Sequence, residues 1–497
     1  MKIPASIKVI VSKLEEKGFE AYIVGGCVRD LLLEKEPGDW DITTNAKPTE
    51  IQKIMEDAEM ETFYENEFLT VGVVVERINK KKKATKDDKE VVEITTYRLE
   101  TKYTDKRHPD EIKAAKTLFE DLARRDFTVN AMVLSLRKAR GEEVIDPYDG
   151  RKDLKNRIIK AVGNPKDRFA EDALRMLRAA RFATVLKFGI EDNTKQAIIE
   201  NSRWLKVISQ ERIRDELVKI IMSDNAAEGI ELLRQLGLLR YIIPELEQGY
   251  QVSQNKHHVY DCYEHNILSL KYACKKSFNV YVRIAALLHD VAKPKTKRGE
   301  GPDATFYGHE IVGARMVKKI LERLKFSKKD VEKITKLVRY HLFYYNVDEV
   351  SESSVRRLVR QVGPEDMEEL LQVRMADRIG SGVPKAEPYK LRHLRYVIEK
   401  ISEDPISVKM IAIRGDKVMK ILNIEPGPKV GQVLNVLMGE ILADPKKNNK
   451  EFLEQETKRL GSLAEKELIG LAKKAEKEKE ALETKNDEMT KKKYWVT

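Results

Sequence analysis

Apolar positions in the first part of the chain fall into short runs of strand character. The segments "AYIVGG", "WDITT", "LTVGVVVERI", "VVEITTYRL" and "VIDPY" are rich in Val, Ile, Thr and Tyr, and polar or turn-forming residues separate them. Between the third and the fourth, "NKKKKATKDDKE" has the composition of a polar hairpin tip. The spacing of Ile7, Ile10, Val11 and Leu14 predicts a surface helix before the strands. The first part of the chain therefore predicts an α/β domain.

Beyond about residue 151 the apolar positions recur with the period of an α-helix. Segments such as "FAEDALRMLRAARFATVLKF" and "AAEGIELLRQLGLLRYI" have the pattern of amphipathic helices, and "IEPGPKVG" predicts a turn between two helices. The charged segment from Glu465 onward predicts a helical tail with a frayed end. We therefore predict an α+β fold, in which an α/β head is followed by a mostly helical body.

Charge and cysteine content narrow the class of protein. The 497 residues carry 93 Lys and Arg against 82 Asp and Glu, a formal net charge of +11, which favours a polyanionic partner such as nucleic acid or indicates a merely basic surface. Cys27, Cys262 and Cys274 form no C-x-x-C pair, which suits a reducing compartment and excludes a cysteine zinc site. No apolar run is long enough to span a membrane, and the N-terminus does not resemble a signal peptide, so we expect the cytoplasm.

The stretch "GDWDITT" places two acids one residue apart at the start of a predicted strand. Residues two apart point to the same side of a strand, so Asp39 and Asp41 are expected side by side, while Trp40 and Ile42 face the core. Two neighbouring carboxylates repel each other unless a cation lies between them, and Mg²⁺ fits oxygen ligands of this kind. The alternative is a solvated strand end without a ligand.

Upstream, "YIVGGCVRDLLL" predicts a strand, a turn at Gly25 and Gly26, and a helix that carries Arg29. Such a turn lets backbone N–H groups face an anion, although no Walker A sequence follows. A phosphate-binding turn beside an acid pair predicts a nucleoside triphosphate site, in which metal ions activate a hydroxyl and hold the leaving pyrophosphate. Glu93 in "VVEITTYR" is our candidate for a third carboxylate; the alternative is an exposed strand residue.

Two later segments carry further candidate residues. "RRDFTVNAM" predicts a helix start in which Asp126 and Asn130 share one face, either as a cap with an ion pair or as part of the site. In "EDALRMLRAAR" the spacing predicts one helical stripe of polar residues, and an ordinary amphipathic helix laced with ion pairs is the alternative. The stripe consists of Asp172, Arg175, Arg178 and Arg181.

The stripe has the chemistry to select between bases. Cytosine and adenine each present an amine donor beside a ring-nitrogen acceptor, whereas guanine and uracil present a carbonyl beside an N–H. A fixed carboxylate at Asp172 and a fixed guanidinium at Arg175 therefore match the first pair and mismatch the second. Each mismatched buried group costs roughly 1–3 kcal/mol.

A second constellation of histidines and acids lies in the helical body. Imidazole and carboxylate ligands together suit Mn, Ni, Fe, Co or Zn better than Mg alone, although a lone histidine is more often a structural residue. The candidates are His265, His289, Asp290, His309, His341 and Asp377.

Five motifs stand in one order between Gly25 and Phe182: "GGCVRD", "GDWDITT", "RRDFTVNAM", "DPYDGRKDL" and "RFAEDALRMLRAARF". Together they resemble the class II tRNA nucleotidyltransferases, which comprise the CCA-adding enzymes and their bacterial poly(A) polymerase relatives. The resemblance implies a polymerase-beta-like head in which Asp39 and Asp41 are catalytic and bind Mg²⁺. The nucleotide-binding residues it implies are Gly25, Gly26, Arg29, Asp30, Arg124, Arg125, Asp126, Asn130, Asp172, Arg175, Arg178 and Arg181.

The histidine-rich set resembles the HD phosphohydrolase superfamily, which implies that His265, His289, Asp290 and Asp377 bind a transition metal, while His309 and His341 permit a second one. The late segment "VKMIAIRGDKVMKILNIEPGPKVGQVLNVLMGEILADP" resembles the tail of HD-containing members, which holds the outer part of tRNA. The predicted parts are a nucleotidyltransferase head (1–150), a helical neck with the template helix (151–225), a helical body (226–395) with the HD domain at about 260–380, a tRNA-binding tail (396–460) and a charged, partly disordered C-terminal helix (461–497).

The function that the resemblance implies is addition of C, C and A to the tRNA 3′ end from CTP and ATP, with release of pyrophosphate. The span "ETKYTDKRHPDEIKAAKTLFEDL" has the length of the loop that CC-adding members lack, although "IKAAKTL" is less apolar than usual. The alternatives are a poly(A) polymerase, a partial A- or CC-adding enzyme, an HD phosphohydrolase acting on RNA-end or cyclic phosphates, and a tRNA-binding chaperone.

Overall fold

The computed structural model describes residues 2–65, 69–76, 89–101, 111–136, 142–255, 259–347, 349–402 and 411–496. Within it the chain forms two compact units. The first comprises Met1–His341 and Gln372–Val383, and the second comprises Leu342–Leu371 and Pro384–Thr497.

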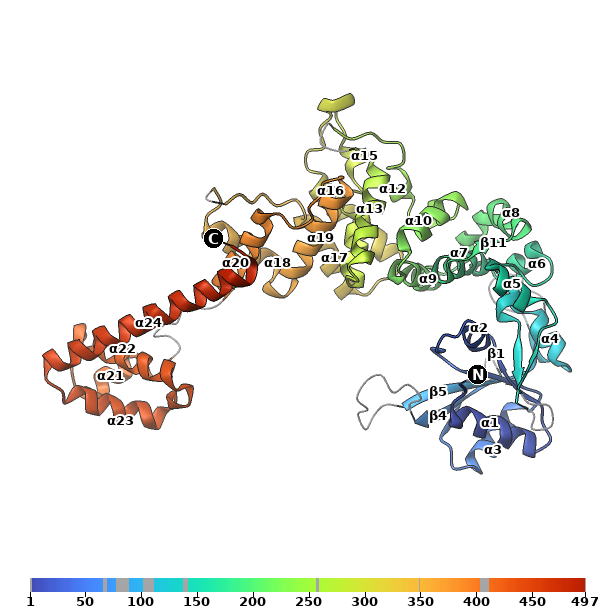
Figure 1. Ribbon diagram of the computed structural model, residues 1–497, viewed down its shortest axis with the longest axis horizontal. Helices are drawn as coiled ribbons and strands as arrows, with labels where there is room; N and C mark the ends of the chain where they lie inside the picture. The colour runs from blue at the N-terminus through green and yellow to red at the C-terminus, as the bar shows by residue number, and fades with distance from the viewer. Residues whose placement is uncertain are drawn as a thin grey trace. The chain divides into compact units, whose positions relative to one another are not determined.

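A seven-stranded mixed sheet forms the head of the first unit (Figure 1). In spatial order the strands are β3 (Thr62–Glu65), β4 (Thr70–Glu76), β5 (Lys89–Thr96), β2 (Asp41–Thr44), β1 (Ala21–Val24), β8 (Val133–Ser135) and β9 (Glu143–Ile145). Strand β2 pairs antiparallel with β1 and parallel with β5, which brings the start of β2 beside the middle of β5.

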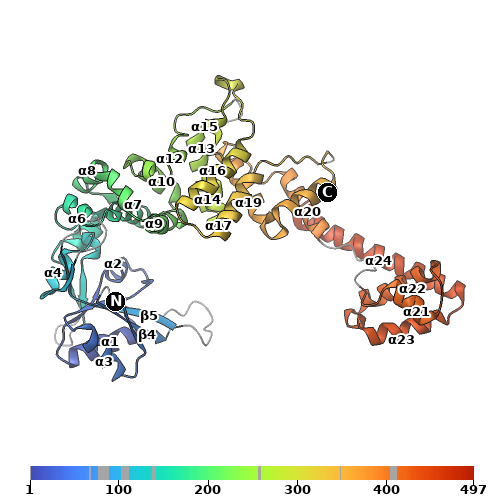
Figure 2. The same cartoon turned by 180° about the vertical axis from the view of Figure 1, so that it is seen from behind.

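Helices α1 (Ala5–Glu16) and α3 (Pro48–Glu56) lie together against the sheet in both views (Figures 1 and 2). Ile7, Ile10, Val11 and Leu14 of α1 are all buried, which confirms the predicted amphipathic helix. Helix α2 (Gly26–Leu32) follows β1 directly, as the sequence predicts.

The predicted strands are confirmed, but the sequence reading missed β3 and β8. The short sheet of β6 (Arg98–Thr101) and β7 (Glu111–Ala114) was also missed. The predicted hairpin tip falls mostly on residues 77–88, and much of the predicted loop falls on 102–110; both stretches lie outside the described residues.

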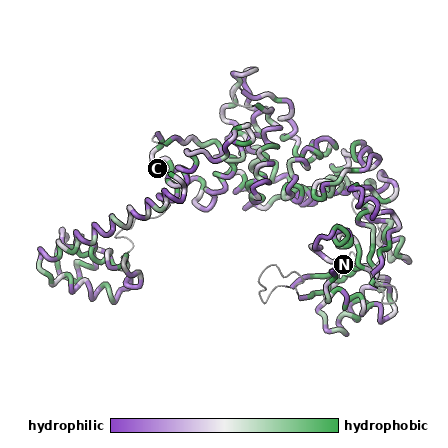
Figure 3. Tube along the Cα trace, in the orientation of Figure 1, coloured by the Kyte–Doolittle hydropathy of each residue, from purple (hydrophilic) through white to green (hydrophobic). Residues whose placement is uncertain are grey.

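The rest of the first unit is mainly helical, as predicted. Its longer helices are α6 (Pro165–Glu171), α7 (Leu174–Leu186), α8 (Asp192–Asn201), α9 (Gln210–Met222), α10 (Ala226–Gln235), α13 (Cys262–Lys275), α14 (Val280–Leu288), α16 (His309–Arg323), α17 (Lys328–Tyr340) and the second half of α19 (Met367–Gly380). Hydrophilic and hydrophobic segments alternate along them in Figure 3, as expected of helices with one buried face.

The predicted polar stripe needs correction at its first residue. Helix α6 ends at Glu171, and Asp172 has the extended angles φ −139° and ψ 106°, so Asp172 lies between two helices rather than on one. Its Oδ1 accepts from the N–H of Leu174 at 3.0 Å and satisfies a donor at the start of α7. Arg175, Arg178 and Arg181 do lie on α7.

The second unit is helical. Its helices are α18 (Glu352–Val362), α20 (Tyr389–Ser402), α21 (Gly415–Leu422), α22 (Pro428–Ala443), α23 (Lys450–Gly461) and α24 (Glu465–Tyr494). Val433 and Leu437 of α22, Leu453 and Leu460 of α23, and Leu468 of α24 are fully buried in one core. The turn predicted at 424–431 is confirmed between α21 and α22, although residues 428–431 already belong to α22. Among the described residues, none of the helices has the length and hydropathy needed to cross a membrane.

Candidate functional site

The acid pair lies where β2 begins. Asp41 is the first residue of the strand and is partly buried, whereas Asp39 precedes it and is exposed. Trp40 and Ile42 are buried, as expected from the alternation of side chains. Burial and the charge of Asp39 raise the pKa of Asp41 to about 7, against the opposing effect of Arg125. The site therefore concentrates negative charge.

Glu93 lies opposite Asp41 in the parallel register of β2 and β5, and its charge also raises the pKa of Asp41. The charges of Asp39 and Glu93 repel that of Asp41, which a bound divalent cation relieves, and carboxylate oxygens are the ligands that Mg²⁺ prefers. The donor set therefore fits the cation that the sequence predicts.

Gly25 brings the turn after β1 close to the acid pair. It has φ +85°, and a Cβ there would lie 3.2 Å from Arg125 Nη1 and 3.6 Å from Asp41 Oδ2. Its N–H donates to the carbonyl of Met132 at 3.3 Å, and the role of the turn in facing an anion stays a prediction. The next residue, Gly26, begins α2.

Arg29 is buried one turn into α2. Its Nη1 donates to Asn130 Oδ1 at 2.8 Å, and its Nε donates to Asp30 Oδ1 at 2.9 Å. The structure thus joins the first and third motifs through predicted nucleotide-binding residues.

The prediction that "RRDFTVNAM" starts an α-helix is wrong. Helix α4 (Leu118–Ala123) ends just before it, and only Thr128–Asn130 forms a short 3₁₀ turn. Asp126 Oδ1 accepts from the N–H of Phe127 at 2.8 Å and from Asn130 Nδ2 at 3.1 Å. These bonds to a neighbouring N–H and side chain compete with a regular helix, because aspartate offers the backbone an alternative partner.

A carboxylate that the sequence reading missed holds the two arginines of this motif. Asp121 is fully buried; its Oδ1 accepts from Arg124 Nη2 at 2.7 Å, and its Oδ2 accepts from Arg125 Nη2 at 3.3 Å and from Thr43 Oγ1 at 3.2 Å. Although burial by itself raises the pKa of Asp121, the two arginines lower it overall. Asp121 precedes Arg124 by three residues and Arg125 by four, a spacing at which side chains of a helix meet, so the sequence did contain a signal for these pairs.

Asp126 joins the head to α7. Arg178 Nε donates to Asp126 Oδ2 at 2.8 Å, and Arg178 Nη2 lies 2.7 Å from the same oxygen. Burial alone would raise the pKa of Asp126, but Arg178 and Asn130 lower it to about 2. On the next turn, the Arg181 guanidinium lies 3.8 Å from the centre of the Phe182 ring and pairs with Glu216.

The two predicted base-reading residues are each held by a protein partner. Arg175 is buried; it pairs with Glu171, and its Nη2 donates to the carbonyl of Arg124 at 2.9 Å. Asp172 accepts from both terminal nitrogens of Arg212, at 2.6 and 3.3 Å. Sequence reasoning missed Arg212, and its separation of 40 residues from Asp172 left no local signal.

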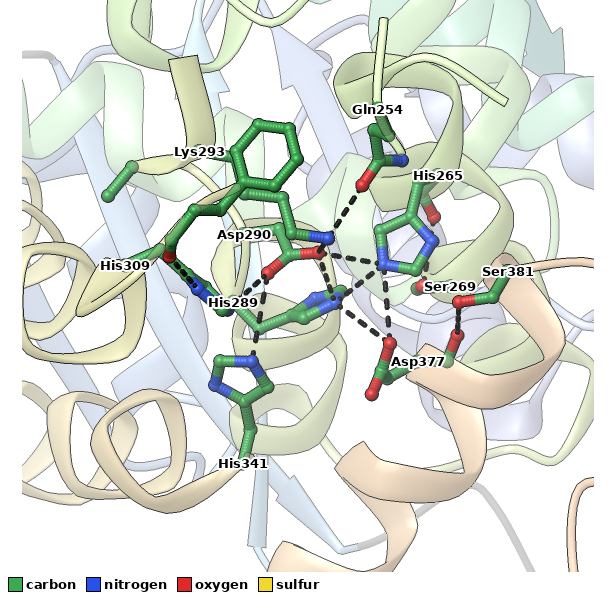
Figure 4. Close-up of polar contacts among 12 residues, drawn as sticks. Gln254, His265, Ser269, His289, Asp290, Lys293, His309, His341, Asp377 and Ser381 are labelled. Carbon is green, nitrogen blue, oxygen red and sulfur yellow. Dashed lines mark hydrogen bonds and ion pairs between the residues drawn. The ribbon is translucent and has the colours of Figure 1, made fainter. Parts of the chain in front are cut away.

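The second cluster meets inside the first unit (Figure 4). His289 and Asp290 follow the end of α14, His265 comes from α13 and Asp377 from α19. All four are buried, and one ligand atom from each lies within 4.8 Å of the others. His265 Nε2 is 2.8 Å from His289 Nε2 and 3.0 Å from Asp290 Oδ2.

Asp290 also faces two further histidines. Its Oδ1 lies 3.3 Å from His309 Nε2 and 3.7 Å from His341 Nε2, which gives a second group of candidate ligands. The Nδ1 atoms of these histidines donate to the carbonyls of Phe306 and Val338, both at 2.7 Å, so each Nε2 faces the cluster. A backbone acceptor behind each ring is the usual support for a metal-binding histidine.

The charges of this cluster also suit a metal site. Burial alone lowers the pKa of His289, but Asp290 and Asp377 raise it to about 10, while the pKa values of both carboxyls are well below their usual range. Burial and the charge of His289 lower the pKa of His341 to about 3. Four imidazoles around two carboxylates form a donor set that fits transition metals.

Lys293 is a third residue that the sequence reading missed. It is buried, its Nζ lies 2.6 Å from Asp290 Oδ2, and it donates to Gln254 Oε1 at 2.6 Å (Figure 4). Lys293 comes three residues after Asp290, a spacing that favours an ion pair, so the sequence contained a signal for this contact.

Family models match three parts of the chain: "Poly A polymerase head domain" at residues 21–160, "Probable RNA and SrmB- binding site of polymerase A" at 187–249, and "HD domain" at 263–380. The CCA-adding enzyme of Lactobacillus delbrueckii subsp. bulgaricus is 44% identical over 229 residues, which are 46% of this chain and 53% of that protein. The chain thus spans about half the length of that relative.

A longer match joins the chain to the A-adding tRNA nucleotidyltransferase of Deinococcus radiodurans, with 36% identity over 343 residues, 66% of this chain and 76% of that protein. The structure of the Bacillus stearothermophilus CCA-adding enzyme in complex with CTP matches with a TM-score of 0.55 and 26% identity, covering 92% of this chain and 98% of that one. The α+β fold with a polymerase head and a helical HD region is therefore confirmed. With this coverage and identity, the chain belongs to the tRNA nucleotidyltransferase family.

Proposed function

We propose that this protein is a CCA-adding tRNA nucleotidyltransferase, which adds C, C and A to the tRNA 3′ end from CTP and ATP and releases pyrophosphate. The observation that carries the proposal is the clustered negative charge at β2 and β5. There burial and the charges of Asp39 and Glu93 raise the pKa of Asp41, and Arg125 lies beside the Gly25 turn. The relatives named CCA-adding enzyme support the choice of product.

In this proposal Asp39 and Asp41 hold Mg²⁺, and Glu93 is the candidate third carboxylate. When bound, the cation supplies charge stabilisation at the reacting phosphate and lowers the pKa of the attacking hydroxyl. The tRNA 3′-hydroxyl attacks the α-phosphate of the nucleotide, and the bond to pyrophosphate breaks. Arg124 and Arg125 neutralise the triphosphate in this proposal, and their ion pairs with Asp121 support it.

Choice of base falls to Asp172 and Arg175. The carboxylate accepts from the exocyclic amine of cytosine or adenine, and the guanidinium donates to the ring nitrogen. Arg175 also pairs with Glu171 and donates to the carbonyl of Arg124, which hold its guanidinium in place. The surrounding ion pairs and hydrogen bonds involve Arg29, Asp126, Arg178 and Arg181.

Primer extension tests this function. Three tRNA transcripts that end before the CCA sequence, after its first C and after its second C are offered CTP and ATP separately, and products are sized at single-nucleotide resolution. We expect two C residues and then one A. Unlimited A addition would indicate a poly(A) polymerase, A addition only after CC would indicate an A-adding enzyme like the Deinococcus relative, and no addition would refute transfer.

We also propose that the body binds a transition metal and hydrolyses phosphate esters at RNA ends. The supporting observation is the convergence of His265, His289, Asp290 and Asp377, with their ligand atoms within 4.8 Å of one another. When bound, the metal supplies a polarised phosphate or an activated water. An assay with a 2′,3′-cyclic phosphate in Ni²⁺, Co²⁺ or Mn²⁺ tests the activity, and absence of hydrolysis in all three would refute it.

The proposed tRNA contacts are the neck, the tail and the lysines of α24. They recognise the phosphates and the shape of tRNA and not its base sequence, because the enzyme must accept every tRNA. The division into five parts at the predicted boundaries stays a prediction.

A further inference from the structure

We propose that an aromatic patch on the second unit stacks against an unpaired base in a loop of the tRNA. The patch consists of Tyr344, Tyr345, Tyr389, Lys390 and His393. The first two belong to the segment Leu342–Leu371 and the other three to α20, and both parts lie in the second unit. The proposal rests on the proposed function and adds a tRNA contact outside the neck, the tail and α24.

Tyr344 projects into solvent and is nevertheless held in place. It is 71% exposed, its hydroxyl donates to Glu349, and the same hydroxyl accepts from Asn346 Nδ2 at 2.9 Å. Asn346 Nδ2 also donates to Glu349 Oε1 at 2.7 Å, which closes a small network. Ordering an exposed side chain costs rotamer entropy, and a hydrogen bond that replaces one to water returns little of it. The ring therefore adds little to the stability of the fold, but it is preorganised for a ligand.

The other rings of the patch lie close to one another. Tyr345 Oη is 2.6 Å from His393 Nδ1, and the centres of these two rings are 6.1 Å apart with their planes 30° from parallel. Tyr389 is 37% exposed, and its ring centre lies 6.0 Å from that of His393, one turn further along α20. A single exposed aromatic side chain is ordinary on a protein surface, whereas a group of them indicates an interaction site.

A cation beside the rings indicates the chemistry of the partner. Lys390 Nζ donates to Asn346 Oδ1, and Asn346 is the residue that holds Tyr344. An ammonium has three donors, so Lys390 retains two for a phosphate. The acid of this network, Glu349, binds the hydroxyl end of Tyr344 and not its ring face. An open aromatic face next to a cation matches a nucleotide, whose base stacks while its phosphate pairs with the charge.

The position of the patch favours a loop of tRNA over other RNA segments. Bases inside a double helix already stack on one another, so only an unpaired base has a free face. In the proposed function the 3′ end of tRNA lies in the head, which leaves the loops. The proposed tRNA-binding tail belongs to the same unit as the patch, and α24 joins the two. Leu468 of α24 is buried in the tail core, and Asp487 of α24 accepts from the Tyr396 hydroxyl of α20.

The test measures Kd by fluorescence anisotropy at several salt concentrations, without nucleotide, for two RNAs. One is a full tRNA transcript that ends before the CCA sequence, and the other is a two-strand duplex with the sequence of its acceptor stem and no loop. The variants are Tyr344→Ala, Tyr344→Phe and Lys390→Gln. The matched control is Tyr307→Ala, because Tyr307 is 84% exposed but lies in the first unit. Circular dichroism and thermal unfolding establish that each variant is folded.

We expect Tyr344→Ala to raise the Kd for tRNA roughly tenfold and Tyr344→Phe, which keeps the ring, to raise it less than about threefold. The slope of log Kd against log salt should be unchanged in Tyr344→Ala and reduced by about 1 in Lys390→Gln. The Kd for the duplex and the Kd values of the control should equal those of the wild type. An unchanged Kd for tRNA in Tyr344→Ala, as expected if the patch binds another protein, would overturn the proposal. So would an equal loss of affinity for tRNA and duplex.

If Tyr344→Ala does not fold, Lys390→Gln decides: a reduced salt slope for tRNA alone supports the proposal, and a wild-type slope overturns it. The wild type separates this proposal from the proposed function. A wild type that binds neither RNA refutes tRNA as the substrate, whereas a wild type that binds and extends tRNA with variants of unchanged Kd refutes only the role of the patch.

Discussion

Replacement of Asp126 by Asn is expected to lower the free energy of unfolding by about 2 kcal/mol at pH 7. The pKa of Asp126 is lowered from 3.8 to about 2 in the folded protein. That difference of roughly 2 units corresponds to about 2.5 kcal/mol, at about 1.4 kcal/mol per unit. Because the Arg178 side chain is 33% exposed, solvent screening reduces the expected value to about 2 kcal/mol.

The sign of the pH dependence follows from the same shift. A carboxyl whose pKa is lowered by folding stabilises the folded state above its unfolded pKa, and the stabilisation is lost as the pH falls towards the folded pKa. The advantage of the wild type over Asp126→Asn should therefore be constant from about pH 5 to 7 and shrink to roughly half at about pH 3.

Urea unfolding followed by tryptophan fluorescence measures this difference. The chain has three tryptophans, and with Trp204 and Trp495 replaced by Phe, buried Trp40 reports on the head. The control is Asp215→Asn, which removes an exposed pair and should change the free energy of unfolding by less than about 0.5 kcal/mol. A midpoint for Asp126→Asn equal to that of the control, or an advantage undiminished at low pH, would refute the reasoning.

Three further substitutions test other parts of the site. Glu93→Gln should lower kcat for nucleotide addition roughly 100-fold or more if Glu93 shares the cation, and steady-state kinetics that match wild type would assign it to the exposed strand face. Asp121→Asn should raise KM for CTP, because Arg124 and Arg125 lose the carboxylate that holds them in position. It should also cost about 3 kcal/mol of stability, measured by urea unfolding. Asp290→Asn should weaken Mn²⁺ binding, measured by calorimetry, by roughly tenfold or more, while CTP addition stays at the wild-type rate. A variant that loses both Mn²⁺ binding and CTP addition would contradict the view that the two sites are separate.

The head was largely predictable because its signals are local. The strand-turn-helix at Gly25 and the alternation around Asp41 depend on neighbours within a few residues, and both are confirmed. The failures are also local in origin. The 3₁₀ turn at Thr128–Asn130 replaces a predicted helix because the Asp126 side chain binds adjacent groups, and periodicity does not register such a bond.

The body shows the same division. His289 and Asp290 are adjacent, so their joint position at the end of α14 could be read from the chain, and the candidate ligands around them do converge. The position of Asp290 between two groups of histidines could not be predicted from the sequence, because it depends on how α13, α16, α17 and α19 pack around α14. The identity of any metal stays a prediction.

The sequence by itself determined most of the longer helices and strands, the family and the types of side chain available for chemistry, because hydrophobic period and short motifs are properties of adjacent residues. Only the tertiary structure decided which partner holds each charge: Asp121 for Arg124 and Arg125, Asp126 for Arg178, and Arg212 for Asp172. Ion pairs form between groups that the fold brings within about 4 Å, and distance along the chain does not determine distance in space. Asp172 is an example. Its spacing in the sequence predicted a place on a helix, but in the structure it lies between two helices and contacts Leu174 and Arg212.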